Sequence, residues 1–182
     1  MTVRRSSSRH VAAFALALCG AAVSTAFAAT SDVSPAGFVA SFHHELKAPP
    51  ARVFEALGHV ERWWNPEHSY SNDASHLSMP LEAGACFCER WDAGAVEHGR
   101  VILVMRDRFV RVDGAFGPLQ ALGAKGILTF AIKAVDGHAV LDATYRVSGS
   151  PAAALDKMAA PVDGVIGEQV QRLVSLVETG HP

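Results

Sequence analysis

Residues 48–70 read APPARVFEALGHVERWWNPEHSY, a stretch that combines a proline pair, an amphipathic segment and a tryptophan pair. The two prolines cannot extend a β-ladder but suit the first turn of a helix. Apolar residues then recur at helical spacing up to Gly58, and Pro66 disfavours helical geometry at the residue before it. The pattern therefore predicts two short helices, over residues 50–58 and 59–64. Helices this short need a larger apolar surface on which to pack.

Alternating segments on both sides of this stretch predict that the surface is an antiparallel sheet. Residues 38–47, FVASFHHELK, alternate as a half-buried strand does. The Asp136–Gly137 pair is the strongest hairpin signal, because this dipeptide tolerates the positive φ of a tight turn. Residues 71–80 form a polar loop long enough to cover an opening. Further strands are expected over residues 85–91, 96–105, 109–116, 126–135 and 138–147.

A long amphipathic helix over residues 161–177 is the last predicted element, after an alanine-rich turn or short helix over residues 151–159. Gln169 falls inside its apolar stripe, whereas Gly164 and Gly167 fall outside it without an evident packing role. This order of elements predicts an α+β fold. A curved antiparallel sheet of about six strands is expected to wrap around the C-terminal helix, with the two short helices after the first strand.

Residues 1–28 are typical of a signal peptide. Three arginines precede an apolar run over residues 11–23, and Ala-Phe-Ala then matches a cleavage site, so we expect cleavage after Ala28 and a periplasmic or secreted protein. The apolar run is short for a membrane-spanning helix, and no stable membrane anchor is expected after cleavage. Residues 29–37 are rich in small side chains and predict a loose leader. Residues 29–182 suit a single domain.

The charge balance bears on the partners of the protein. Cleavage would remove three of the 16 basic residues and none of the 18 acidic ones, leaving a formal net charge of −5. An acidic chain without a basic stripe disfavours binding to nucleic acid. The sequence also carries no phosphate-binding loop, dinucleotide fingerprint or nucleophile elbow, so no cofactor is expected. It carries no signal for an oligomeric state.

The order of elements can be compared with known families. Together with residues 48–57 (APPARVFEAL), the following Arg-Trp-Trp and the terminal amphipathic helix, it resembles the START-like superfamily, also called SRPBCC. Within it, the nearest branch is that of polyketide cyclase-like and chaperone-ATPase-activator-like proteins, and the resemblance covers residues 38–178. It implies a helix-grip fold with a deep cavity between sheet and long helix, and a hydrophobic small molecule as ligand. Expected export argues against chaperone-ATPase activation.

Strand parity selects candidate residues for such a cavity. Glu89 shares a face with Phe87, so it is a buried carboxylate if the aromatic face points inward. It would then orient a ligand or act as an acid, or else form a structural ion pair. His98 shares a strand face with Arg100 and Ile102, and the sequence does not settle whether that face points inward. His98 is therefore a ligand contact, a base or a structural histidine. Facing each other across a hairpin, Glu89 and His98 could transfer protons.

Four further residues complete the expected ligand-binding set. Trp63 and Trp64 cannot both face inward from one helix, and we assign Trp64 to the cavity. His68 lies at the expected mouth. Tyr145 and Gln169 would orient the polar end of a hydrophobic ligand. The alternative for Tyr145 is that it only packs in the core.

Cys86 and Cys88 are the only cysteines that remain after the expected cleavage. At positions i and i+2 of a regular strand they are too far apart for an unstrained mutual disulfide. We interpret them as small buried hydrophobic residues or as an intermolecular link. A thiolate site completed by His98 or His68 is a weaker alternative, because Cys-x-Cys lacks the second pair of structural zinc motifs, and no metal is expected.

Two functions follow from these expectations. The first is a noncatalytic periplasmic or secreted carrier or sensor that binds a hydrophobic or aromatic small molecule between the sheet and the C-terminal helix. The second is a small cyclase-like or dehydratase-like enzyme in which Glu89 and His98 act as acid and base. The sequence does not choose between them.

Overall fold

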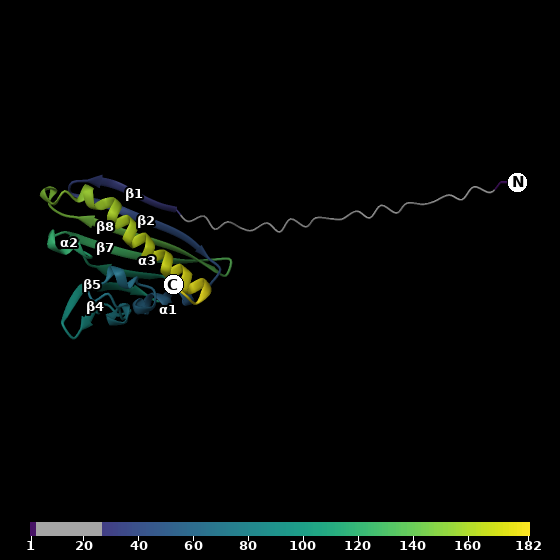
Figure 1. Ribbon diagram of the computed structural model, residues 1–182, viewed down its shortest axis with the longest axis horizontal. Helices are drawn as coiled ribbons and strands as arrows, with labels where there is room; N and C mark the ends of the chain where they lie inside the picture. The colour runs from purple at the N-terminus through teal and green to yellow at the C-terminus, as the bar shows by residue number, and fades with distance from the viewer. Residues whose placement is uncertain (3–26) are drawn as a thin grey trace.

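Eight antiparallel strands form one curved, unclosed sheet in the computed structural model, which describes residues 1–2 and 27–182 (Figure 1). The order across the sheet is β1-β2-β8-β7-β6-β5-β4-β3. The strands are β1 (Phe27–Ser34), β2 (Gly37–Leu46), β3 (Leu77–Ser78), β4 (Cys86–Trp91), β5 (Gly94–Met105), β6 (Phe109–Asp113), β7 (Lys125–Val135) and β8 (His138–Ser148). The predicted α+β helix-grip arrangement is confirmed, with eight strands rather than about six.

The helices are short except for the last one. They are α1 (Pro50–Gly58), α2 (Pro118–Ala121) and α3 (Ala159–Thr179), with 3-10 turns η1 (Val60–Arg62), η2 (Pro66–His68), η3 (Ala74–His76), η4 (Pro151–Ala153) and η5 (Leu155–Met158). The two helices expected after the first predicted strand are α1 and the single turn η1. Within the described part of the chain, no helix combines the length and apolarity needed to cross a membrane.

The segment expected to be a loose leader is instead an edge strand. Strand β1 pairs antiparallel with β2, from Phe27 opposite His43 to Ser34 opposite Gly37. Its small and polar residues gave no alternating apolar pattern, but backbone hydrogen bonds to the open edge of β2 do not require one. Two of its residues precede the cleavage point expected after Ala28. The rest of the expected signal peptide, residues 3–26, lies outside the described residues.

Helix α3 lies across one face of the sheet and buries a continuous apolar side against it (Figure 1). Leu173 is fully buried, which stabilises the fold by about 1.5–3 kcal/mol for a side chain of this size. Gly167, for which the sequence offered no packing reason, faces β2: a Cβ built there would lie 3.0 Å from Cε1 of Phe42. The helix therefore approaches β2 closely at this point, because the glycine leaves room for the phenyl ring.

Candidate functional site

A cavity of about 220 Å³ opens between α3, the segment around α2 and the turns that follow α1. Its wall is mainly apolar, with three residues that carry polar atoms on imidazole or phenol rings. The volume lies below the roughly 300 Å³ at which pockets for drug-sized ligands begin, so the cavity suits a small molecule. The lining residues are Trp64, His68, Tyr70, His98, Phe116, Gly117, Pro118, Leu119, Met158, Pro161, Val162, Val165 and Ile166.

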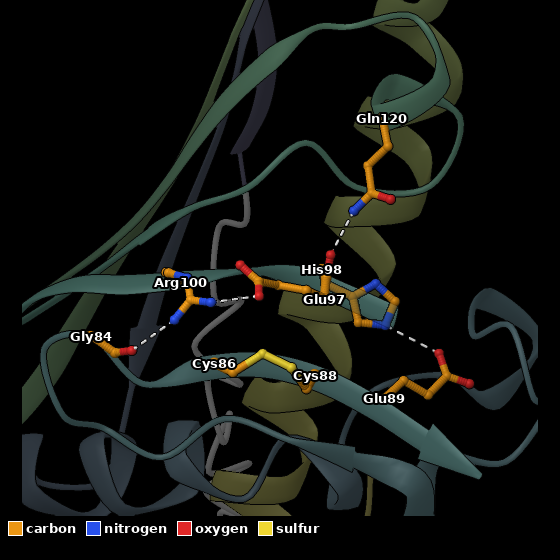
Figure 2. The surroundings of a disulfide bond; sticks show 8 residues. All are labelled: Gly84, Cys86, Cys88, Glu89, Glu97, His98, Arg100 and Gln120. Carbon is orange, nitrogen blue, oxygen red and sulfur yellow. Dashed lines mark hydrogen bonds and ion pairs between the residues drawn. A yellow bond between two sulfur atoms is a disulfide. The ribbon is translucent and has the colours of Figure 1, made fainter. Parts of the chain in front are cut away.

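His98, in this wall, meets Glu89, which lies behind it. Oε2 of Glu89 lies 3.1 Å from Nε2 of His98, and the Glu89 side chain is fully buried (Figure 2). The same carboxylate accepts hydrogen bonds from the backbone N–H groups of Tyr70 (3.0 Å) and Ser71 (2.6 Å). Glu89 therefore holds the loop after η2 against β4, and its oxygens are occupied by protein donors.

The pKa of Glu89 is lowered from its ordinary value. Burial by itself raises it, but hydrogen bonds from Ser71, Tyr70 and His98 stabilise the charged form and prevail. A carboxyl group that stays ionised and saturated with donors is a poor general acid. Glu89 acts on the cavity through His98 and the loop, and it is not among the residues that line the cavity.

His98 is held in one tautomer by this contact. Because an ionised carboxylate only accepts hydrogen bonds, Nε2 carries the proton and Nδ1 is an acceptor. Burial lowers the pKa of His98, and the hydrogen bond and charge of Glu89 only partly oppose this. Within the described residues Nδ1 makes no hydrogen bond, so it is the unused acceptor of a neutral imidazole in the cavity wall.

A β-bulge brings the two side chains to the same face. Phe87 pairs with Gly99 and Cys88 pairs with Glu97, so His98 has no partner on β4. The predicted parity of His98 with Arg100 and Ile102 is therefore broken: His98 is buried, while Arg100 and Ile102 are exposed. Bulges next to sites commonly re-aim one side chain in this way.

Gly99 is the sequence signal that could have revealed the bulge. A Cβ built on it would lie 2.5 Å from the carbonyl oxygen of Asp113 and 2.9 Å from Cα of Gly114. Only glycine tolerates such an approach, and an isolated glycine within a strand pattern is typical of a bulge or a close backbone contact.

Gln169 fixes His68, a second imidazole of the cavity wall. The backbone N–H of Asn65 donates to Oε1 of Gln169 (2.7 Å), which leaves the Gln169 amide nitrogen to donate to Nδ1 of His68 (3.0 Å) and to the carbonyl of Val165 (3.1 Å). The shorter contact from Gln169 makes Nδ1 of His68 an acceptor, so Nε2 carries the proton, while Oε2 of Glu168 lies 3.4 Å from the same Nδ1. Gln169 supports the wall from behind and does not line the cavity.

Both tryptophans are buried in the core, contrary to the expectation that they could not both face inward, but of the two Trp64 alone lines the cavity. Trp63 is in the core, where its indole N–H donates to the carbonyl of Ala56 (3.0 Å). Trp64 lines the cavity and donates to the carbonyl of His68 (3.0 Å), so its indole also ties the His68 turn in place. Contact of Trp64 and His68 with a ligand stays a prediction.

Tyr145 lies one layer behind the cavity wall. Its ring stacks on Phe116, with centroids 5.0 Å apart, and its hydroxyl accepts from the N–H of Phe116 (3.1 Å) and donates to the carbonyl of Gly114 (2.9 Å). Burial raises the pKa of this phenol. The hydroxyl therefore makes both of these hydrogen bonds to the segment after β6, and it holds that segment in place.

Cys86 and Cys88 form a mutual disulfide, contrary to the expectation from regular strand spacing (Figure 2). Their Cα atoms are 5.3 Å apart, whereas positions i and i+2 of a regular strand are separated by about 6.7 Å. The register shift between β4 and β5 falls between these two cysteines, so the regular ladder is interrupted at this point. With both sulfurs bonded to each other, neither is a free hydrophobic thiol or an intermolecular link.

The lining contributed by the segment around α2 was not foreseen. Phe116 to Leu119 follow β6 as a break in the strand pattern, and only the Gly117–Pro118 pair marked that break in the sequence. Gln120 connects this segment to the bulge, because its side-chain amide donates to the carbonyl of Glu97 (2.8 Å).

Comparisons with known proteins support the fold. No protein-family model matches this sequence, and no curated protein matches it either. Among solved structures, CalU16 from Micromonospora echinospora is similar with a TM-score of 0.61 and 12% identity, over 90% of this chain and 80% of that one. The Aha1 dimer from Colwellia psychrerythraea matches with a TM-score of 0.58 and 16% identity, over 78% of this chain and 97% of that one. Protein CV1439 from Chromobacterium violaceum matches with a TM-score of 0.55 and 19% identity, over 77% of this chain and 96% of that one. These likenesses support the helix-grip fold.

Proposed function

We propose that this chain is an exported START-like (SRPBCC) protein that binds a small apolar molecule carrying a hydroxyl group. The observation that carries the proposal is the unused Nδ1 acceptor of His98 in a mainly apolar cavity, with the tautomer set by Glu89. Pockets of this composition bury the apolar body of a ligand and use a few placed polar groups to orient it.

A hydroxyl group complements the two histidines of the cavity. His98 offers an acceptor, and the hydrogen bond from Gln169 leaves His68 with an N–H donor at Nε2. A hydroxyl donates one hydrogen bond and accepts another, so a ligand hydroxyl can pair with either ring. A ligand that lacked a donor would leave the buried nitrogen of His98 without a partner, at a cost of about 1–3 kcal/mol.

Export is proposed from the sequence of residues 1–28, and the disulfide fits it, because such bonds persist mainly in oxidising compartments. Cleavage after Ala28 would shorten β1 at its outer end but leave Ala29 to Ser31 paired with β2. Sequencing the N-terminus of protein recovered from the periplasm and the medium tests this. A mature chain beginning at Ala29 supports the proposal, and an intact Met1 in the cytoplasm contradicts it.

Ligand binding is tested with 2-naphthol and its ether 2-methoxynaphthalene, which share the fused rings but differ in the donor. Titration followed by tryptophan fluorescence should show tighter binding of 2-naphthol by about tenfold, since one unmade hydrogen bond is worth about 1.4 kcal/mol. His98→Phe should abolish the preference. Val165→Phe should fill the cavity and reduce binding of both probes, whereas Val135→Phe, at the exposed turn between β7 and β8, should not.

The second candidate is proton-transfer catalysis, favoured by the Glu89–His98 pair. A carboxylate that fixes the tautomer of an imidazole leaves the other nitrogen to act as a general base. His98 would take the proton, and Glu89 would position it and stabilise the imidazolium. Native mass spectrometry of protein from its own host, with extraction of the bound molecule, separates the two functions. Recovery of the molecule unchanged after incubation supports binding alone, and conversion that is lost in His98→Gln supports catalysis.

A further inference from the structure

The Cys86–Cys88 disulfide lies on β4 directly opposite the bulge that carries His98 (Figure 2). We propose that this bond is a thiol–disulfide exchange site, reduced by a dithiol, and that its reduction weakens ligand binding in the cavity. This inference rests on the proposed function for its effect on the ligand, but its effect on the protein can be measured without one.

The disulfide holds β4 in an irregular conformation. It keeps the Cα atoms of Cys86 and Cys88 5.3 Å apart, shorter than the roughly 6.7 Å of a regular strand. The register shift between β4 and β5 falls at the same place. Removing the covalent link lets β4 extend there, and a change of register by one residue moves side chains to the other face of a sheet.

The side chains affected are those that build the site. Phe87, between the two cysteines, packs on the rings of His98 and Trp64, with centroid distances of 5.1 and 5.4 Å. Glu89, next after Cys88, holds both His98 and the amides of the loop after η2. An extension of β4 therefore displaces the cavity wall and the carboxylate that clamps the loop.

A second connection runs through β5 to α2. Glu97 pairs with Cys88, and its carbonyl accepts from the side chain of Gln120. Pro118 and Leu119, on the same short helix, line the cavity. The disulfide, the bulge and this part of the wall thus form one connected unit.

The surroundings favour attack at Cys86. Cys86 is partly exposed, whereas Cys88 is buried. The residue opposite Cys86 on β5 is Arg100, whose guanidinium also binds the carboxylate of Glu97 (2.7 Å) and the carbonyl of Gly84 (3.3 Å). Because the Glu97 carboxylate lies within 4.8 Å of both sulfurs and pairs with Arg100, it is the accessibility of Cys86 that favours attack there.

The exchange is balanced with a dithiol as the reductant. Its thiolate attacks Sγ of Cys86 and forms a mixed disulfide, while the bond between the two cysteines breaks and Cys88 leaves as a thiolate that takes up a proton. The second thiol of the reductant then displaces Cys86, which is protonated in turn. The protein gains two electrons and two protons, and the reductant becomes its own disulfide.

The test uses dithiothreitol as the dithiol and 2-naphthol as the cavity probe, with a chelator present throughout. The chelator is needed because Cys86, Cys88 and Glu97 have ligand atoms within 4.8 Å of one another and could hold a metal ion once reduced. We expect two thiols to appear, the affinity for 2-naphthol to fall at least about fivefold, the low end of couplings between sites, and reoxidation to restore it. A folded protein whose disulfide resists dithiothreitol overturns the proposal, as does one that is reduced without change in affinity.

Amide hydrogen exchange gives a readout that needs no ligand. The N–H groups of Tyr70 and Ser71 donate to Glu89, so their exchange should be faster in the reduced protein. If these two amides exchange at the same rate in the oxidised and the reduced protein, the inference is overturned, whatever happens to the affinity for 2-naphthol. If the oxidised protein fails to bind 2-naphthol, that contradicts the proposed function alone, and the amides still decide the inference.

Two variants separate the covalent bond from other effects of the reductant. Cys86→Ser removes the disulfide at the partly exposed position. This variant should therefore have the 2-naphthol affinity of the reduced protein, and dithiothreitol should not change it. Glu97→Gln keeps the disulfide and removes a carboxylate beside it, so its 2-naphthol affinity should still respond to dithiothreitol. A Cys86→Ser protein that folds and behaves as the oxidised wild type contradicts the proposal.

Discussion

Glu89 and His98 meet at 3.1 Å across the β4–β5 hairpin because β5 carries one more residue than β4 at that point, and the extra residue is His98 itself. The bulge thus turns an imidazole toward the inner face, where a carboxylate from the neighbouring strand fixes its tautomer. The same carboxylate holds the loop that brings Tyr70 to the cavity.

Glu89→Gln is expected to lower the free energy of unfolding by about 1.5–3 kcal/mol, the range for hydrogen bonds to charged groups. A glutamine presents an amide N–H where the carboxylate accepted one, so two donors would face each other at Tyr70 or Ser71. Glu97→Gln is the matched control on the same hairpin. Its exposed pair with Arg100 is worth about 0–1 kcal/mol. Urea unfolding measures both, and equal losses would contradict the role given to Glu89.

Acid should destabilise the protein in two steps. His98 has its pKa lowered from 6.5 and Glu89 from 4.5, so the folded state binds protons more weakly than the unfolded chain at both groups. The free energy of unfolding therefore falls as pH decreases below about 6.5, and Glu89 adds to the fall below about 4.5. One displaced proton contributes at most about 1.4 kcal/mol per pH unit.

His98→Gln should reduce the slope of stability against pH below about pH 6.5, because the pKa of His98 is lowered in the folded state. Burial, with a contribution from the charge of His43, also lowers the pKa of His44, so the wild-type slope contains both histidines. His44→Gln should therefore remove a separate part of it. Unfolding in urea at several pH values gives the slopes, and a His98→Gln protein with the full wild-type slope would show that His98 titrates normally in the fold.

The sequence predicted the elements with strong periodicity. The stripe that became α3, the Asp136–Gly137 hairpin and the placing of Trp63 in the core all depend on local patterns that tertiary structure did not override. Strand β1 was missed because its backbone pairing with β2 leaves little trace in side chains as small as those of residues 28–31.

Parity arguments failed where a bulge interrupted the ladder. Glu89 was correctly placed on the face of Phe87, but His98 and the Cys86–Cys88 pair were judged on a regular strand that does not exist there. One unpaired residue reverses the alternation, and only Gly99 marked it in the sequence. The networks behind the cavity could not be derived either, since Gln169 and His68 are brought together only by the packing of α3.

The two tyrosines of the chain make a matched pair of tests. Tyr145→Phe removes a buried hydroxyl and leaves the N–H of Phe116 and the carbonyl of Gly114 without this partner, so we expect a loss of about 1–3 kcal/mol in the free energy of unfolding. Tyr70→Phe changes a half-exposed side chain and should cost less than about 0.5 kcal/mol. If Tyr145 instead contacts the ligand, Tyr145→Phe would lower 2-naphthol affinity without this loss of stability.

Gly99→Ala tests the bulge directly. The new methyl group would lie 2.5 Å from a carbonyl oxygen and 2.9 Å from Cα of Gly114, and both contacts are with backbone, which cannot rotate away as a side chain can. We expect a loss of about 1–3 kcal/mol in urea unfolding, the usual cost of an added methyl in a packed site, together with weaker 2-naphthol binding as His98 moves. Gly164→Ala is the control, because nothing lies within 4 Å of a Cβ there. In the interior of α3 it should raise stability by about 0.5–1 kcal/mol. If Gly99→Ala left both stability and probe binding unchanged, the close contact at the bulge could not be what turns His98 inward.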